Sequence, residues 1–256
     1  MQLLNIEWLK IRKYTTFWVL VGLFTGLFFM WTYGISSGVL NINDMLKSSF
    51  AFPSIWANLG YLYSWFVIFL CVFVIISITN EFTFKTHRQN IIDGQSRMDF
   101  LHAKMFLILA ITLSATLFFF VIGMIFGFAN GGGNPFEGIE KLIYVFLFTL
   151  NYLSFSALLA FFIRRSGLSI ILLLAYFLME SILTKLINYK LNTQIGNFFP
   201  LQSSDELLPW NALKSMANMV GTAKADLPNY AYLIASCVWI GIYYFILRKK
   251  ITTSDL

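Results

Sequence analysis

The sequence predicts an all-α membrane protein with six transmembrane helices, and three observations carry this prediction. Hydrophobic residues make up 58% of the 256-residue chain and charged residues only 12%, with a mean hydropathy of +0.73. Typical soluble domains are about 45–50% apolar and about 25% charged. Six stretches approach the roughly 20 apolar residues that cross a bilayer. These stretches do not alternate in polarity as β-barrel strands do.

The six expected spans cover residues 15–34, 57–79, 105–128, 142–163, 168–187 and 230–247. The first follows Lys10, Arg12 and Lys13 and so imitates a signal peptide. However, its apolar run is long enough to span, and no small-residue cleavage site follows. We therefore expect a single transmembrane domain over residues 15–256, preceded by a cytoplasmic amphipathic helix over residues 1–14.

The positive charge indicates the orientation of the chain. Twelve of the 18 Lys and Arg residues, including all six arginines, lie on the side that holds the N-terminus. Cytoplasmic loops carry such an excess, so both termini are expected in the cytoplasm. The net charge of +6 is thus an orientation signal and a cytoplasmic docking surface, and it gives no support to a nucleic-acid partner.

The N-terminal segment is expected to form a helix on the membrane surface. Leu4, Trp8 and Ile11 share one stripe, and Glu7 and Lys10 can pair at i, i+3. Two interpretations stay open: an anchor drawn to anionic lipid, or a lever that contacts a cytoplasmic partner.

The connection after the second span begins as a second amphipathic helix. Glu81 and Lys85 are spaced for an i, i+4 ion pair. Phe84, Arg88 and Ile91 share a stripe. A partner could dock on such a surface, although an interfacial helix with snorkelling side chains has the same pattern.

The same connection then carries a stop and a new start. Gly94 is a favourable helix end, and Ser96 is a favourable N-cap with Asp99 at the capping-box position. A short helix, a turn and a capped helix therefore fit between the second and third spans.

These patterns resemble the type-2 permeases of bacterial ATP-binding-cassette (ABC) transporters. The resemblance rests on Glu81, Thr86-x-Arg88, Gly94-x-Ser96-Arg97 and Lys104 after the second span, and on Glu7-x-x-Lys10-x-Arg12 before the first. Six spans with both ends inside are similar too. His87 departs from the pattern, since many relatives have a small or aliphatic residue there.

The resemblance implies a bacterial inner-membrane protein with a coupling helix over residues 81–93 and a connecting helix at the N-terminus. It implies short re-entrant helices within residues 188–229. The implied ATPase contacts are Glu81, Phe84, Lys85, Arg88, Ile91, Asp93 and Arg97. The implied partners are two ABC ATPase subunits, membrane lipid, and a second permease copy or a homologous permease.

Two polar side chains lie inside expected spans. Glu180 is about twelve residues into the fifth span, and Asn151 lies in the fourth. An ionisable group at such depth is costly and is a functional candidate. Each side chain either lines a cavity and meets substrate or forms a hydrogen bond between helices.

Two pairs of glycines have the small-xxx-small spacing that lets helices approach closely. Gly22 and Gly26 lie in the first span, and Gly123 and Gly127 in the third. We expect both pairs to pack within the bundle rather than in a dimer.

Enzymatic motifs are missing from the sequence. It has no G-x-x-x-x-G-K-[ST] phosphate loop and no G-x-S-x-G nucleophile motif. Cys71, Cys237, His87 and His102 have no ligand spacing. We therefore expect no enzyme, no catalytic residue, no metal and no cofactor in this chain, with ATP and Mg²⁺ bound by the partner ATPase.

The expected function is that of a permease subunit in an ABC exporter. Its many aromatic side chains suit a hydrophobic or amphipathic cargo such as a peptide, lipid or drug, although lipid-facing Phe explains them equally well. Two alternatives stay open: a six-span secondary transporter or channel, and a non-transporting membrane scaffold.

Overall fold

The computed structural model describes residues 2–38, 50–86, 94, 96–131, 133–209 and 227–253, with backbone alone for residues 2–6. Within these ranges the chain forms helices and no strand. The helices are α1 (Gln2–Arg12), α2 (Thr15–Ser36), α4 (Ile55–Thr83), α6 (Arg97–Ala129), α7 (Lys141–Ile163), α8 (Ser166–Leu191), η1 (Ile195–Phe198), α9 (Gln202–Asp205) and α11 (Asn229–Thr253). The predicted all-α class is confirmed.

Six of these helices are long and apolar enough to cross a membrane: α2, α4, α6, α7, α8 and α11. Each contains one of the six predicted spans, so the chain is built as a multi-pass membrane protein. The helices extend beyond the predicted spans, most clearly in α4 and α6. The predictions followed apolar runs, whereas backbone hydrogen bonding continues the helices into their polar ends.

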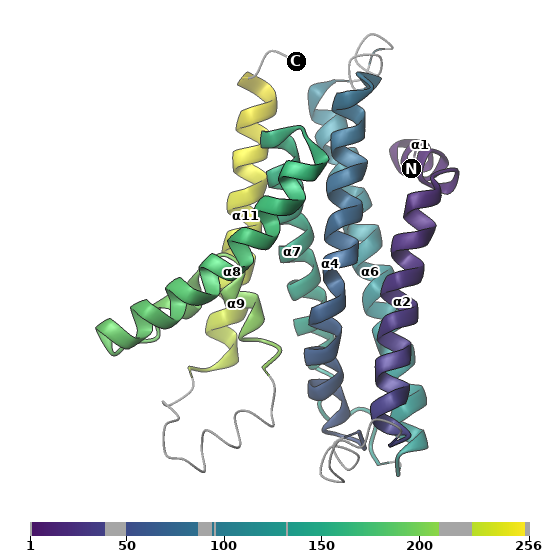
Figure 1. The fold of residues 1–256 in the computed structure, drawn as a ribbon, viewed down its shortest axis with the longest axis vertical. Helices are drawn as coiled ribbons and strands as arrows, with labels where there is room; N and C mark the ends of the chain where they lie inside the picture. The colour runs from purple at the N-terminus through teal and green to yellow at the C-terminus, as the bar shows by residue number, and fades with distance from the viewer. Residues whose placement is uncertain are drawn as a thin grey trace.

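Helices α4 and α7 form the centre of the bundle and pack together more extensively than any other pair. Tyr63 and Thr149 join them by a buried hydroxyl–hydroxyl hydrogen bond of 2.7 Å. Phe28 of α2 and Phe119 of α6 are fully buried against Tyr63. Helix α8 leaves the bundle obliquely, so most of its surface is not covered by the described residues (Figure 1).

The two glycine pairs have different surroundings. A Cβ atom at Gly123 would overlap the Trp56 ring, and one at Gly127 would overlap the Phe52 ring. This pair packs inside the bundle, as predicted. Gly22 and Gly26 have no atom within 4 Å of a Cβ position. The prediction of bundle packing is therefore wrong for the first pair within the described residues, because α2 turns this face outward.

Helix α1 and the ends of three spanning helices meet at one end of the bundle. Helix α1, the end of α4, the start of α6 and the end of α11 lie there (Figure 1). The predicted capping box is confirmed: the Asp99 amide donates to the Ser96 hydroxyl, and the Ser96 amide donates to the Asp99 carboxylate. Gly94 adopts φ +96°, a conformation that suits glycine at the predicted stop.

Candidate functional site

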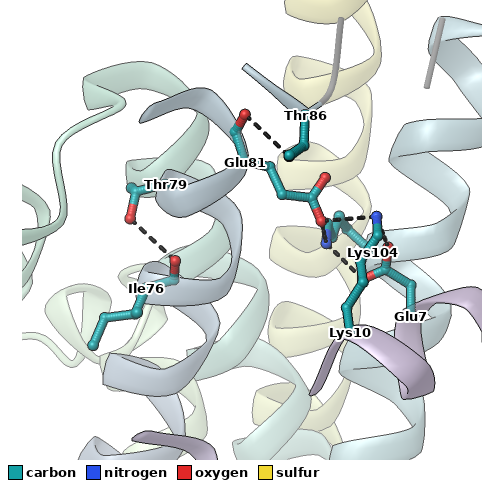
Figure 2. Close-up of polar contacts among 7 residues, drawn as sticks. All are labelled: Glu7, Lys10, Ile76, Thr79, Glu81, Thr86 and Lys104. Atoms are coloured by element: carbon teal, nitrogen blue, oxygen red, sulfur yellow. Dashed lines mark hydrogen bonds and ion pairs between the residues drawn. The ribbon is translucent and has the colours of Figure 1, made fainter. Parts of the chain in front are cut away.

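Four charged side chains from three helices meet at this end of the bundle. Glu7 and Lys10 come from α1, Glu81 from the last turns of α4, and Lys104 from the third turn of α6 (Figure 2). The Lys104 Nζ atom donates to both Glu7 Oε2 and Glu81 Oε1. The Lys10 Nζ atom lies 3.2 Å from Glu7 Oε1 and 3.2 Å from Glu81 Oε1. We call these four residues the charged cluster.

Three members of the charged cluster are almost inaccessible to solvent, whereas the side chain of Lys10 is 36% exposed. The exposed fraction is 1% for Lys104, 3% for Glu7 and 7% for Glu81. Isolated charges are costly in such surroundings, so each needs a partner with good geometry. The two carboxylates and two ammonium groups balance one another, which ties α1, α4 and α6 together at this point.

The same ion pairs shift the pKa values of the two α1 residues, Glu7 and Lys10. Burial by itself raises the pKa of Glu7, but the Lys104 and Lys10 ammonium groups more than offset it and hold the pKa below 4.5. Burial by itself lowers the pKa of Lys10, but the Glu81 and Glu7 carboxylates raise it above 10.5. Both groups therefore stay charged at neutral pH.

Aromatic contacts extend the charged cluster to α7. Phe82, Phe100 and Phe161 pack edge to face with ring centroids 5.7–6.2 Å apart. The Arg164 guanidinium, at the end of α7, lies 5.1 Å from the centroid of Phe82. A further hydrogen bond, from Asn80 Nδ2 to the Tyr14 hydroxyl, is 2.8 Å long. The end of α4 is thus held by three neighbouring helices and by the chain that follows α1.

The predicted stripe on α1 is only partly shown. Ile11 is buried and packs in the core, whereas Trp8 is 50% exposed, and the side chain of Leu4 is outside the described residues. The predicted Glu7–Lys10 pair is confirmed. This helix therefore binds the bundle through its charged pair and Ile11.

The predicted ATPase-contact residues lie in different parts of the structure. Glu81 is inside α4 rather than in a following helix, because α4 continues to Thr83. Phe84 is 72% exposed directly after α4. Lys85 is exposed with φ 55°, and Arg97 is exposed as the first residue of α6. Arg88, Ile91 and Asp93 are outside the described residues.

The predicted Glu81–Lys85 pair is wrong. The helical path breaks at Phe84, and the left-handed conformation of Lys85 removes the i, i+4 geometry. Glu81 instead binds Lys104 and Lys10, which are far from it in sequence. Tertiary packing therefore overrides the local pairing.

The two predicted intramembrane side chains bind one segment, formed by η1 and α9. Glu180 Oε1 accepts from the Leu201 amide at 2.9 Å and from the Gln202 amide at 3.4 Å. Asn151 Nδ2 donates to the Pro200 carbonyl at 2.7 Å and to the Ser204 hydroxyl at 2.9 Å. The side chains therefore hold the η1–α9 segment against α7 and α8.

Helix α11 holds the same segment from another side. Trp239 Nε1 donates to the Phe198 carbonyl at 2.9 Å, and the Ser236 hydroxyl donates to the Ser203 hydroxyl at 3.3 Å. A Cβ atom at Gly196 would come within 2.9 Å of the Thr184 carbonyl. The η1–α9 segment is thus fitted tightly between three helices.

Two partners in these contacts are not predicted by the sequence patterns. Lys104 is predicted only as part of the resemblance, although a lysine in a largely apolar helix is itself a signal for a buried ion pair. Asp205 is not among the predicted site residues, yet its Oδ1 atom accepts from the Tyr152 hydroxyl at 2.6 Å. Nothing local to Asp205 signals this contact, because its partner is 53 residues away.

Within the described part of the chain, no group of three or more His, Cys, Asp or Glu side chains could hold a metal ion. Cys71 is buried and Cys237 exposed, and both are free thiols. His102 lies 3.2 Å from the Tyr244 hydroxyl, which links α6 to α11. The described polar contacts thus link helices to one another.

Residues 18–250 match a family model described as "Protein of unknown function (DUF2705)". The match covers most of the chain, from the first turn of α2 to the last turn of α11. The search of curated proteins found no match.

Proposed function

The chain belongs to the DUF2705 family, and we propose that it is the membrane-spanning permease subunit of a bacterial ABC exporter. Its cargo is hydrophobic or amphipathic, and ATP is hydrolysed on a separate ATPase subunit. The observation that carries the proposal is the charged cluster, in which Lys104 joins α1 to the ends of α4 and α6.

The charged cluster suits the transmission of force. Helices α4 and α6 flank a short connection, residues 84–96. A partner that moves this connection pulls on both helices, and the Lys104–Glu81 ion pair keeps their ends together. Because Glu7 binds the same ammonium group, α1 moves with them. The ends of both spanning helices can therefore shift as one unit, which is the rigid-body type of transition.

Phe84 marks where the partner docks. Its ring is 72% exposed at the end of α4, beside the charged cluster. Exposed aromatic side chains are frequent anchors of protein interfaces. The other predicted contacts that follow Phe84, namely Arg88, Ile91 and Asp93, are outside the described residues and belong to this proposal through the sequence resemblance alone.

The remaining parts of the proposal follow from the ABC architecture. Two ATPase subunits and a second permease copy, or a homologous one, complete the transporter in the inner membrane. The end of the bundle that holds α1 and the end of α11 faces the cytoplasm, as the arginine and lysine excess supports. The η1–α9 segment is the re-entrant element on the opposite side.

The direct test is purification of the tagged chain from native membranes in mild detergent, with identification of its partners. We expect an ABC ATPase subunit in stoichiometric amount. Recovery without any nucleotide-binding subunit, together with ATP-independent transport, would instead identify a secondary transporter or channel.

A pair of matched substitutions tests the docking site. Phe84→Glu should reduce recovery of the ATPase at least tenfold without changing membrane insertion. Phe136→Glu is the control, since Phe136 is 68% exposed in the connection between α6 and α7 at the other end of the bundle. Equal loss of the ATPase in both variants, or no loss in either, contradicts the assignment of Phe84.

A further inference from the structure

A cavity of about 380 Å³ lies between α4, α7 and α8 and reaches α9. Small-molecule sites usually measure about 300–1,000 Å³, so this volume is in their range. Its walls include the side chains of Tyr61, Trp65, Phe148, Tyr152, Phe177 and Asp205. The cavity is open beside Trp65 and Phe177, which are 65% and 43% exposed.

Asp205 places a carboxylate in the wall of this aromatic cavity. Its Oδ1 atom is fixed by the Tyr152 hydroxyl at 2.6 Å. Its position is fixed further because Asn151 binds Ser204, the preceding residue, and Glu180 binds the start of α9. The carboxylate is therefore held rigidly at the edge of the cavity.

The carboxylate has no cationic partner among the residues that the structure describes. This distinguishes it from Glu7 and Glu81, each of which binds two ammonium groups. An ionised carboxylate in apolar surroundings is costly unless a cation compensates it. Aromatic faces add to the attraction of a cation, because the ring quadrupole is negative above the plane.

We propose that this cavity binds an amphipathic organic cation, whose charged group pairs with Asp205 and whose apolar body lies against Tyr61, Phe148 and Phe177. The claim that this cation is the transported cargo rests on the proposed function. Binding to the purified chain does not depend on it. A neutral lipid chain fits the apolar wall but leaves the carboxylate uncompensated, and a second copy of the chain must bring its own cation to Asp205.

The test uses the full-length chain alone, without ATPase, in nanodiscs of phosphatidylcholine, which carries no net charge. The probe is radiolabelled tetraphenylphosphonium, a cation with aromatic arms, and unlabelled probe measures displaceable binding. We expect one saturable site per chain. Asp205→Asn keeps the size of the side chain and should weaken binding at least tenfold.

Glu206→Gln is the matched control, because it removes the same charge from the next residue, which does not line the cavity. It should change the affinity by less than twofold.

Leu174→Trp is a second variant that fills the cavity from α8 without touching the Asp205–Tyr152 contact. It should abolish displaceable binding. The buried thiol of Cys71 must stay unreactive in every variant, which reports a folded bundle.

Three results overturn the inference: no displaceable binding to the unmodified chain, equal affinity of the unmodified chain and the Asp205→Asn variant, or equal weakening by Asp205→Asn and Glu206→Gln. If binding is absent and Trp65→Cys chains cross-link in a Cys237→Ser background, the cavity is covered by a second copy. If the probe does not bind but the ATPase is still recovered with the chain, only this inference is contradicted. If the probe binds but no ATPase is recovered with the chain, only the proposed function is contradicted.

Discussion

The bundle contains two buried polar regions that are built on different principles. The charged cluster joins α1, α4 and α6 by ion pairs between side chains. The η1–α9 segment is held mainly by side chains that bind backbone groups, such as Glu180 on the Leu201 amide and Asn151 on the Pro200 carbonyl. The first region needs charge on every partner, whereas the second needs only a donor or an acceptor in the right place.

This difference has a mechanical meaning. Buried ion pairs between side chains hold their helices to one another, which suits helix ends that move as one unit. Hydrogen bonds to backbone amides fix one chain path and suit a permanent element. The comparison thus favours helix ends that are joined to one another at the charged cluster and a chain segment that is fixed in place near Glu180.

The largest expected effect is at the centre of the charged cluster. Lys104→Met leaves Glu7 and Glu81 buried and opposed mainly by Lys10, so we expect a loss of about 3–5 kcal/mol of folding free energy. The measurement is reversible unfolding in mixed micelles. Lys104→Arg keeps the charge and is the control. A triple change that also makes Glu7→Gln and Glu81→Gln should recover part of the loss, because the charge left in the cluster is then that of Lys10, which is partly exposed to solvent. A loss below about 1 kcal/mol in Lys104→Met contradicts the ion-pair description.

The second prediction contrasts two glutamates. Glu81→Gln removes a charge that Lys104 and Lys10 both use, so it should cost about 1.5–3 kcal/mol, the range for hydrogen bonds to charged groups. Glu180→Gln keeps the oxygen that accepts from Leu201, so it should cost less than about 1 kcal/mol. Unfolding curves of both variants, measured side by side, check this order. The reverse order shows that Glu180 has a role that depends on its charge.

The third prediction concerns Asn151. Asn151→Ala removes the donor to the Pro200 carbonyl and to Ser204, so it should cost about 1–3 kcal/mol. It should also expose the η1–α9 segment to added protease more than Lys104→Met does. Faster cleavage elsewhere, with the η1–α9 segment unchanged, contradicts its assignment as the clamp of this segment.

The smallest expected effect is a pH dependence. The pKa of Glu7 is lowered in the folded chain, so its stabilisation is present above the usual value of 4.5 and is lost as the pH falls through the folded pKa. The difference in melting temperature between the unmodified chain and Glu7→Gln should therefore be largest near pH 7 and shrink below pH 4.5. A constant difference from pH 7 to pH 3 contradicts the ion pairs of Glu7.

Local chemistry made much of the fold predictable. Apolar run length located all six spanning helices, and Ser96 with Asp99 predicted the start of α6 because a capping box needs only neighbouring residues. The i, i+3 pair of Glu7 and Lys10 was predictable for the same reason. The Glu81–Lys85 pair failed because a local rule competed with a buried lysine from another helix.

The sequence by itself determined that this chain is a six-helix membrane protein with an excess of basic residues at one set of loops, since hydrophobic length and charge need no neighbours to act. Only the tertiary structure decided which polar groups meet. It brought Lys104 to Glu7 and Glu81, Glu180 to Leu201, and Asp205 to Tyr152. The physical reason is that a buried charge or donor is satisfied by whichever partner packing brings near, and packing joins residues far apart in the chain.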